Sequence, residues 1–95
     1  MINKFLDYIS VEKRYSQNTL VSYKKDLEDL LLFISETEGT EDLKKVDKKI
    51  IRNFIVSLSE KKIQKRSINR KLSSLRSFYL YLLYLNCIII FFDLN

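Results

Sequence analysis

Basic and hydroxyl side chains are mixed along the segment SINRKLSSLRSFYLYL, residues 67–82, in a way that suits contact with phosphates. The segment carries Arg70, Lys71 and Arg76 among four serines, and it has no acidic residue. Guanidinium groups reach phosphates or guanine edges, while small hydroxyl side chains let a helix backbone come close to the same surface. An acidic residue on that face would be repelled. The residue types therefore predict that this segment binds a polyanion.

The positive charge of the chain, +5 in total, is concentrated in its last third. Residues 1–30 are neutral overall and residues 31–60 carry −1, whereas residues 61–95 hold seven basic residues and one acidic residue, a net charge of +6. The seven lie within sixteen positions: Lys61, Lys62, Lys65, Arg66, Arg70, Lys71 and Arg76. Such a stripe is typical of a nucleic-acid-binding protein, and a solvated helix face is the alternative explanation.

A second polar cluster, Ser16, Gln17, Asn18 and Thr19, surrounds the expected start of another helix. Free backbone amide groups and the helix dipole favour an anion such as a phosphate at such a position. Ser16 also has the right type and place to cap the helix, and this role alone accounts for its presence. The cluster therefore fits either a phosphate contact or an ordinary N-cap.

The sequence shows no motif for catalysis or metal binding. It contains no histidine, and its single cysteine, Cys87, excludes an internal disulfide and a thiolate zinc cluster and fits a reducing, cytoplasmic setting. None of the six tyrosines lies in a catalytic motif, and a phenol without electrophilic neighbours has a pKa of about 10 and is a poor nucleophile. We expect no catalytic residue, metal, cofactor or small-molecule substrate.

Helical periodicity predicts how these residues are positioned. With 95 residues, no proline and one glycine, the chain is expected to form a single all-α domain rather than a turn-rich β structure. Apolar residues spaced three and four apart predict helices over residues 3–13, 17–36 and 48–61, and a fourth that begins between residues 64 and 67. Four amphipathic helices with short connections favour a four-helix bundle.

Each expected helix has one apolar face. The inward positions are Ile2, Phe5, Leu6 and Ile9; then Leu20, Tyr23, Leu27, Leu30, Leu31 and Ile34; then Ile51, Phe54, Ile55 and Leu58; and finally Ile68, Leu72, Leu75, Tyr79 and Leu82. The opposite side of the second helix shows Ser22, Lys25, Asp26 and Asp29. In the fourth helix Arg66, Arg70, Ser73 and Ser77 cluster opposite Leu72 and Leu75, with Asn69, Ser74 and Arg76 on the flanks. The expected N-caps are Ser16 and Asp47.

The end of the chain is apolar. Residues 78–92, FYLYLLYLNCIIIFF, carry no charge, but fifteen residues are fewer than the roughly 20 that a membrane-spanning helix needs, and Asn86 interrupts them. The N-terminal residues do not have the pattern of a secretory signal. We expect no membrane association, and we divide the chain into a domain over residues 1–86 and an apolar tail, or the start of a linker, over residues 87–95.

Two runs of residues resemble the N-terminal core-binding domain, also called the SAM-like domain, of Xer-type tyrosine recombinases and phage integrases. The first run comprises Ser16, Asn18, Thr19, Tyr23, Asp26 and Leu27. The second comprises Arg70, Leu72, Ser73, Leu75, Arg76 and Phe78. The resemblance extends over residues 2–85, nearly the whole chain. After Leu85 the sequence departs from the family, whose members continue with a polar linker.

The resemblance implies a four-helix, SAM-like domain that forms half of a clamp around double-stranded DNA, with its second and fourth helices facing the major groove. In the family a separate C-terminal domain cuts and rejoins the strands through a tyrosine, so this chain is expected to bind DNA without catalysing a reaction. The resemblance carries the DNA-facing role to Ser16, Asn18, Thr19, Ser22 and Lys25 in the second helix and to Arg66, Asn69, Arg70, Ser73, Arg76 and Ser77 in the fourth.

A helical protein-interaction module is the alternative function that the residues leave open. In that case the apolar and aromatic segment from Tyr79 to Phe92 is the working surface, contacting another protein or a neighbouring recombinase protomer, and the basic stripe only keeps the domain hydrated. A membrane-associated peptide is a weaker third alternative, because residues 1–60 already form amphipathic helices suited to a core in water.

Overall fold

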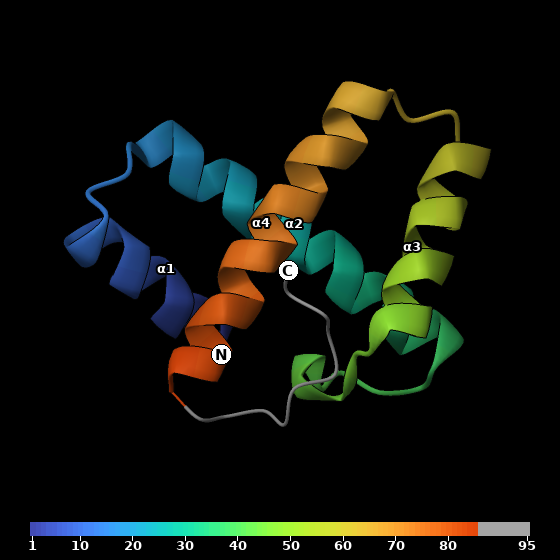
Figure 1. Cartoon of the computed structure of the whole chain (residues 1–95), viewed down its shortest axis with the longest axis horizontal. Coiled ribbons are helices and arrows are strands. Elements are labelled where there is room, and N and C mark those ends of the chain that lie inside the picture. The colour runs from blue at the N-terminus through green and yellow to red at the C-terminus, as the bar shows by residue number, and fades with distance from the viewer. Residues whose placement is uncertain (86–95) are drawn as a thin grey trace.

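The computed structural model describes residues 1–85, which form four α-helices and one 3₁₀ turn (Figure 1). The elements are α1 (Ile2–Glu12), α2 (Gln17–Thr37), η1 (Leu43–Lys45), α3 (Lys48–Glu60) and α4 (Lys65–Tyr84). This part of the chain contains no strand, so the predicted all-α fold is confirmed. None of its helices has the length and apolar character that crossing a membrane requires. The expected tail, residues 87–95, lies outside the described residues.

Side-chain caps fix the starts of α2 and α3. The Oγ atom of Ser16 accepts a hydrogen bond from the Thr19 amide at 3.2 Å, and the Oδ1 atom of Asp47 accepts one from the Ile50 amide at 3.0 Å. Each bond satisfies a backbone N–H group that a helix leaves unpaired in its first turn. Both predicted N-caps are therefore confirmed.

The helix α2 is the centre of the domain and packs against α1, α3 and α4. Figure 1 shows α2 crossing behind α4, with α1 on the left of the crossing and α3 on the right. Phe5 joins α1 to both central helices, because its ring contacts Phe78 edge-on at 5.3 Å and lies parallel to Tyr23 at 6.1 Å. These contacts are part of one hydrophobic core, whose buried residues are Phe5, Ile9, Leu27, Leu30, Ile34, Leu43, Val46, Phe54, Leu58, Ile68, Leu75, Phe78, Tyr79 and Leu82.

The buried face of α4 is turned relative to the predicted one. Four predicted inward residues of this helix are buried: Ile68, Leu75, Tyr79 and Leu82. The fifth, Leu72, is only partly buried. Three residues outside the predicted stripe are buried as well: Lys71, Ser74 and Phe78. Hydrophobic periodicity assigns lysine and serine to the surface, so the pattern alone could not place this face correctly.

A buried hydrogen bond ties α4 to the connection between α2 and α3. The Tyr79 hydroxyl donates to the backbone carbonyl of Leu43 in η1 at 2.6 Å. Burial, with a smaller contribution from Asp42, raises the pKa of Tyr79, so the phenol keeps the proton that it donates. The bond satisfies the polar end of a side chain that is otherwise part of the core.

We predict that Tyr79→Phe destabilises the domain by about 1 kcal/mol, because it removes this buried hydrogen bond. The Leu43 carbonyl then retains the longer bond, 3.4 Å, from the Val46 amide. Urea unfolding followed by circular dichroism measures the change. Tyr84→Phe is the matched control, since Tyr84 is 73% exposed and its loss of a hydroxyl should change the free energy of unfolding by less than about 0.5 kcal/mol. Equal stabilities of the two variants would contradict the prediction.

Candidate nucleic-acid interface

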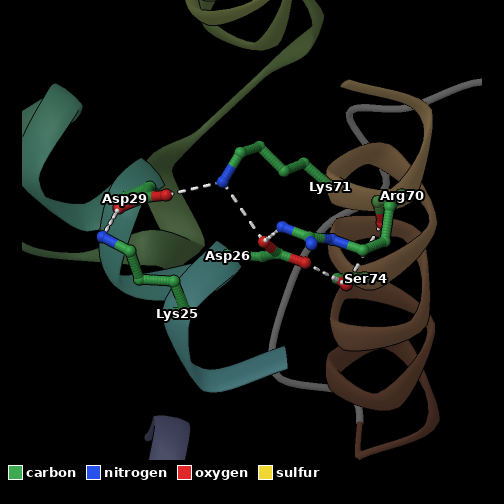
Figure 2. Close-up of polar contacts among 6 residues, drawn as sticks. All are labelled: Lys25, Asp26, Asp29, Arg70, Lys71 and Ser74. Atoms are coloured by element: carbon green, nitrogen blue, oxygen red, sulfur yellow. Dashed lines mark hydrogen bonds and ion pairs between the residues drawn. The ribbon is translucent and has the colours of Figure 1, made fainter. Parts of the chain in front are cut away.

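A fully buried carboxylate lies where α2 meets α4 (Figure 2). The Oδ1 atom of Asp26 accepts hydrogen bonds from Arg70 Nη2 at 2.8 Å and from Lys71 Nζ at 3.2 Å. Its Oδ2 atom accepts one from the Ser74 hydroxyl at 2.7 Å. The three donors come from neighbouring turns of α4, so a single acid of α2 contacts the part of α4 that the sequence singled out for polyanion binding.

The prediction that Asp26 lies on the outer, polar side of α2 is wrong. The side chain of Asp26 is 0% exposed. A buried charge is costly unless it is paired and hydrogen-bonded, and here both carboxylate oxygens have donors. Ser74, expected on a flank of the fourth helix, is also buried, and its hydroxyl donates to Asp26 Oδ2. Among residues 1–85 no buried side-chain nitrogen or oxygen lacks a hydrogen-bond partner.

Lys71 extends the cluster to a second acid of α2. Its ammonium group, on a side chain that is only 9% exposed, lies 2.6 Å from Asp29 Oδ2 as well as 3.2 Å from Asp26 Oδ1. Lys25 contacts the other oxygen of Asp29 at 2.8 Å. Partial burial acts to raise the pKa of Asp29, but the hydrogen bonds from Lys25 and Lys71 outweigh it and hold the pKa below its ordinary value. Basic and acidic groups therefore alternate along the boundary between α2 and α4.

These ion pairs give a second reason for the absence of acidic residues from the segment 67–82. The acids that pair with Arg70 and Lys71 are supplied by α2, so α4 itself needs none. Lys71 is buried and serves the fold, and it is not part of the exposed basic stripe. Arg70 is different, because its side chain remains 51% exposed while it contacts Asp26.

Most of the residues predicted to face DNA are on the surface. The exposed ones are Ser16, Asn18, Lys25, Arg66, Asn69, Arg70, Ser73 and Arg76. The partly buried ones are Thr19, Ser22 and Ser77. The exposed side of α4 is turned toward Asn69 and Arg76, which the sequence placed on the flanks, and away from Ser74. The DNA contact of each residue stays a prediction.

Besides Arg70, three of these predicted residues already have partners in the free domain: Ser16, Thr19 and Lys25. The hydroxyl groups of Ser16 and Thr19 lie 3.0 Å apart, and Ser16 also caps α2. Lys25 pairs with Asp29 on the next turn of the same helix, at the surface, where such a pair contributes little to stability. Neither arrangement closes the site, because Ser16 and Lys25 remain exposed.

The far end of α4 carries the aromatic patch that the sequence indicated. Tyr81 packs against Tyr8 and Phe5 of α1 at ring distances of 4.9 and 5.3 Å, so α1 covers part of the patch. Leu80 and Tyr84 remain 45% and 73% exposed. Within residues 1–85 no group of three histidine, cysteine or acidic side chains is placed to hold a metal ion.

Taken together, these features define an all-α domain whose last long helix presents basic residues on one side and ends in an exposed aromatic patch. Residues 2–84 match the family described as phage integrase, N-terminal SAM-like domain, and the chain belongs to that family. The resemblance inferred from the two runs of residues is thereby confirmed. The matched family is an N-terminal domain, which agrees with the prediction of a domain distinct from a catalytic one.

Tyrosine recombinases named XerC are similar to this chain. The protein from Anoxybacillus flavithermus is 42% identical over 82 residues, which cover 86% of this chain and 27% of the relative. That from Oceanobacillus iheyensis is 40% identical over 81 residues, 85% of this chain and 26% of the relative. The protein from Listeria monocytogenes is 39% identical over 85 residues, which cover 90% of this chain and 28% of the relative. The chain thus spans about a quarter of the length of these relatives. No solved structure matches it significantly.

The lowered pKa of Asp29 predicts how stability depends on pH. Its ionised form is favoured in the folded state, so the stabilisation is complete above the unfolded pKa of about 3.9 and is lost as the pH falls through the folded value. Thermal unfolding from about pH 7 down to about pH 2.5 should show Tm falling in acid. In Asp29→Asn, Tm at neutral pH should be lower and the fall in acid smaller.

Glu28→Gln is the matched control for this experiment. Glu28 lies next to Asp29 on α2 but is exposed, so its substitution should leave the acid-induced fall in Tm unchanged. Parallel curves for the wild type and Asp29→Asn would show that the ion pairs with Lys25 and Lys71 do not favour the ionised carboxylate.

Proposed function

We propose that this chain is a DNA-binding domain of a tyrosine recombinase and that it holds duplex DNA through α2 and α4. The observation that carries the proposal is the exposed side of α4, where Arg66, Asn69 and Arg76 lie on the surface and no acidic residue occurs between positions 61 and 85. The family of the chain and the printed name of its relatives, tyrosine recombinase, support the same function.

The chemistry of this side of α4 suits a nucleic acid better than another protein. Long guanidinium side chains at Arg66, Arg70 and Arg76 alternate with the small exposed Ser73, so the helix backbone can approach a groove while the charges reach phosphates on either side. Lys61, Lys62 and Lys65 extend the positive charge toward the start of the helix. Phosphate contacts of this kind supply affinity and orientation without fixing a base sequence.

The helix α2 contributes the second edge of the proposed interface. Asn18 and Ser22 lie eight and four residues before Asp26, so they occupy the two preceding turns of α2 on nearly the same side as Asp26. Lys25 directly precedes Asp26. Because Asp26 contacts Arg70 and Ser74, these residues border the same boundary as the basic residues of α4. The two helices would thus approach the major groove together.

The role proposed for this chain is binding only. Strand cleavage in the parent protein would belong to a separate domain, because the sequence given contains no histidine and none of its tyrosines lies among electrophilic groups that would activate it. Double-stranded DNA is the proposed partner, and the parent protein is proposed to be a site-specific recombinase.

A protein-interaction surface at the end of α4 is the second candidate. The observation in its favour is the exposure of Leu80 and Tyr84 beside the partly covered Tyr81, an apolar patch at the edge of the domain. Its occupant would be another protomer of the recombinase.

The DNA-binding proposal predicts weak, salt-sensitive association of the 95-residue chain with a short duplex. If roughly three or four phosphates are contacted, the logarithm of the binding constant should fall with the logarithm of salt concentration at a slope of about −3, with Kd in the micromolar range at low salt. Replacing Arg66 and Arg76 together by alanine should reduce the slope to about −1 and weaken binding at least about tenfold. Fluorescence anisotropy measures both quantities.

Lys48→Ala with Arg52→Ala is the matched control for the arginine pair. Both residues are exposed on α3, and their substitution removes the same amount of charge from a helix that the proposal does not use. A similar loss in the two double variants would mean that binding depends only on net charge. Absence of binding to any duplex at low salt would refute the proposed function.

The second candidate predicts a different result in sedimentation. Self-association that rises with concentration and is abolished by Leu80→Ser with Tyr84→Ser, which removes the exposed apolar side chains, would support the protein-interaction surface, provided that the chain also shows no salt-sensitive binding to DNA. Sedimentation velocity of the wild type and this double variant makes the comparison, and a monomer at all concentrations would exclude self-association.

A further inference from the structure

We propose that Asp26 is a positioning residue for DNA binding, which holds the guanidinium of Arg70 in the orientation that contacts a phosphate. The inference rests on the proposed function and goes beyond it. It assigns a role in DNA binding to Asp26, a buried acid that does not itself contact the DNA. Asp26 is 0% exposed, whereas the Arg70 side chain that it holds is 51% exposed.

The geometry leaves Arg70 able to bind two partners at once. Only its Nη2 atom contacts Asp26, at 2.8 Å, and within residues 1–85 the guanidinium has no other hydrogen-bond partner. A guanidinium carries several N–H donors in a rigid plane. One edge of that plane can therefore remain on Asp26 while another donates to a phosphate oxygen.

Asp26 is itself held firmly enough to act as an anchor. Ser74 donates to its Oδ2 atom at 2.7 Å and Lys71 to its Oδ1 atom at 3.2 Å, both in the buried boundary between α2 and α4 (Figure 2). Long side chains such as arginine lose conformational entropy when a ligand orders them. Because Asp26 orders Arg70 before DNA arrives, part of this cost is removed from the binding step.

The charge of Asp26 is balanced inside the cluster. Lys71 is almost fully buried and contacts both Asp26 and Asp29, and Lys25 contacts Asp29 from the surface. Among these five groups the three cations outnumber the two acids by one charge, so the exposed guanidinium of Arg70 still presents positive charge to a phosphate.

The alternative is that Asp26 competes with DNA for Arg70, and the two cases predict opposite signs. Asp26→Asn raises the net charge of the chain from +5 to +6, so electrostatic attraction alone, or release of Arg70 from a competitor, would strengthen DNA binding. Loss of the anchor would weaken binding in spite of the added positive charge.

A double-mutant cycle in the 95-residue chain tests the inference. Affinity for a short duplex is measured for the wild type, Asp26→Asn, Arg70→Ala and the double variant, at a temperature at which circular dichroism shows each to be folded. We expect Asp26→Asn to weaken binding about fivefold and Arg70→Ala about tenfold, with the double variant no weaker than Arg70→Ala. Glu28→Gln is the matched control: it neutralises an exposed acid two residues from Asp26 on α2, adds the same positive charge, and should not weaken binding.

A second pair of variants covers the case in which Asp26→Asn does not fold. Ser74→Ala removes the hydrogen bond to Asp26 Oδ2 without changing any charge. It should weaken DNA binding about twofold, and this effect should also disappear when Arg70 is alanine. Asp26→Asn combined with Lys71→Met removes both buried charges, keeps the net charge unchanged and should weaken binding about fivefold relative to the wild type.

Each remaining outcome overturns the inference. Stronger binding by Asp26→Asn would show competition, and a loss that persists in the Arg70→Ala background would show that Asp26 acts only through the fold. Unchanged binding by Arg70→Ala would refute the positioning role but leave the proposed function intact. A wild-type chain that binds no duplex would refute both.

Discussion

A carboxylate that is removed from water must be surrounded by donors, and Asp26 imposes this requirement on the whole arrangement of α2 and α4. Its three partners, Arg70, Lys71 and Ser74, occupy one short stretch of α4. If α4 were displaced by one turn along α2, both carboxylate oxygens would lose their donors. Buried ion pairs often contribute little net stability, but the donors of this cluster meet Asp26 in the observed register of the two helices.

The same cluster decides which basic residues are available to a ligand. The sequence shows a concentrated positive stripe, but the structure assigns Lys71 to the interior, where it pairs with Asp26 and Asp29 of α2. Arg66 and Arg76 remain exposed. The count of positive charges in a segment therefore overstates its capacity to bind a polyanion when neighbouring helices supply acids.

Helix positions were predictable from the sequence because they follow from local rules. Apolar spacing predicted the first three helices to within one residue at each end and the start of the fourth, and residue type predicted the caps at Ser16 and Asp47. The polar core was not predictable in this way, since the periodicity that identifies a buried leucine assigns a buried aspartate or lysine to the surface. The two runs that carry the family resemblance do contain Asp26 and Arg70, but nothing in their spacing shows that the side chains meet. That contact depends on the packing of α2 against α4, which brings together two residues 44 positions apart in the chain.

The hydrogen bond from Tyr79 to the Leu43 carbonyl fixes the second half of α4, as Asp26 fixes the first. With both halves attached to other parts of the domain, α4 cannot roll or slide by itself to suit the surface it meets. In the proposed complex the domain would then behave as a stiff template, and the duplex would take up any misfit by bending or by changing its groove width. Local flexibility of the DNA would influence where such a domain settles, in addition to the bases that it touches.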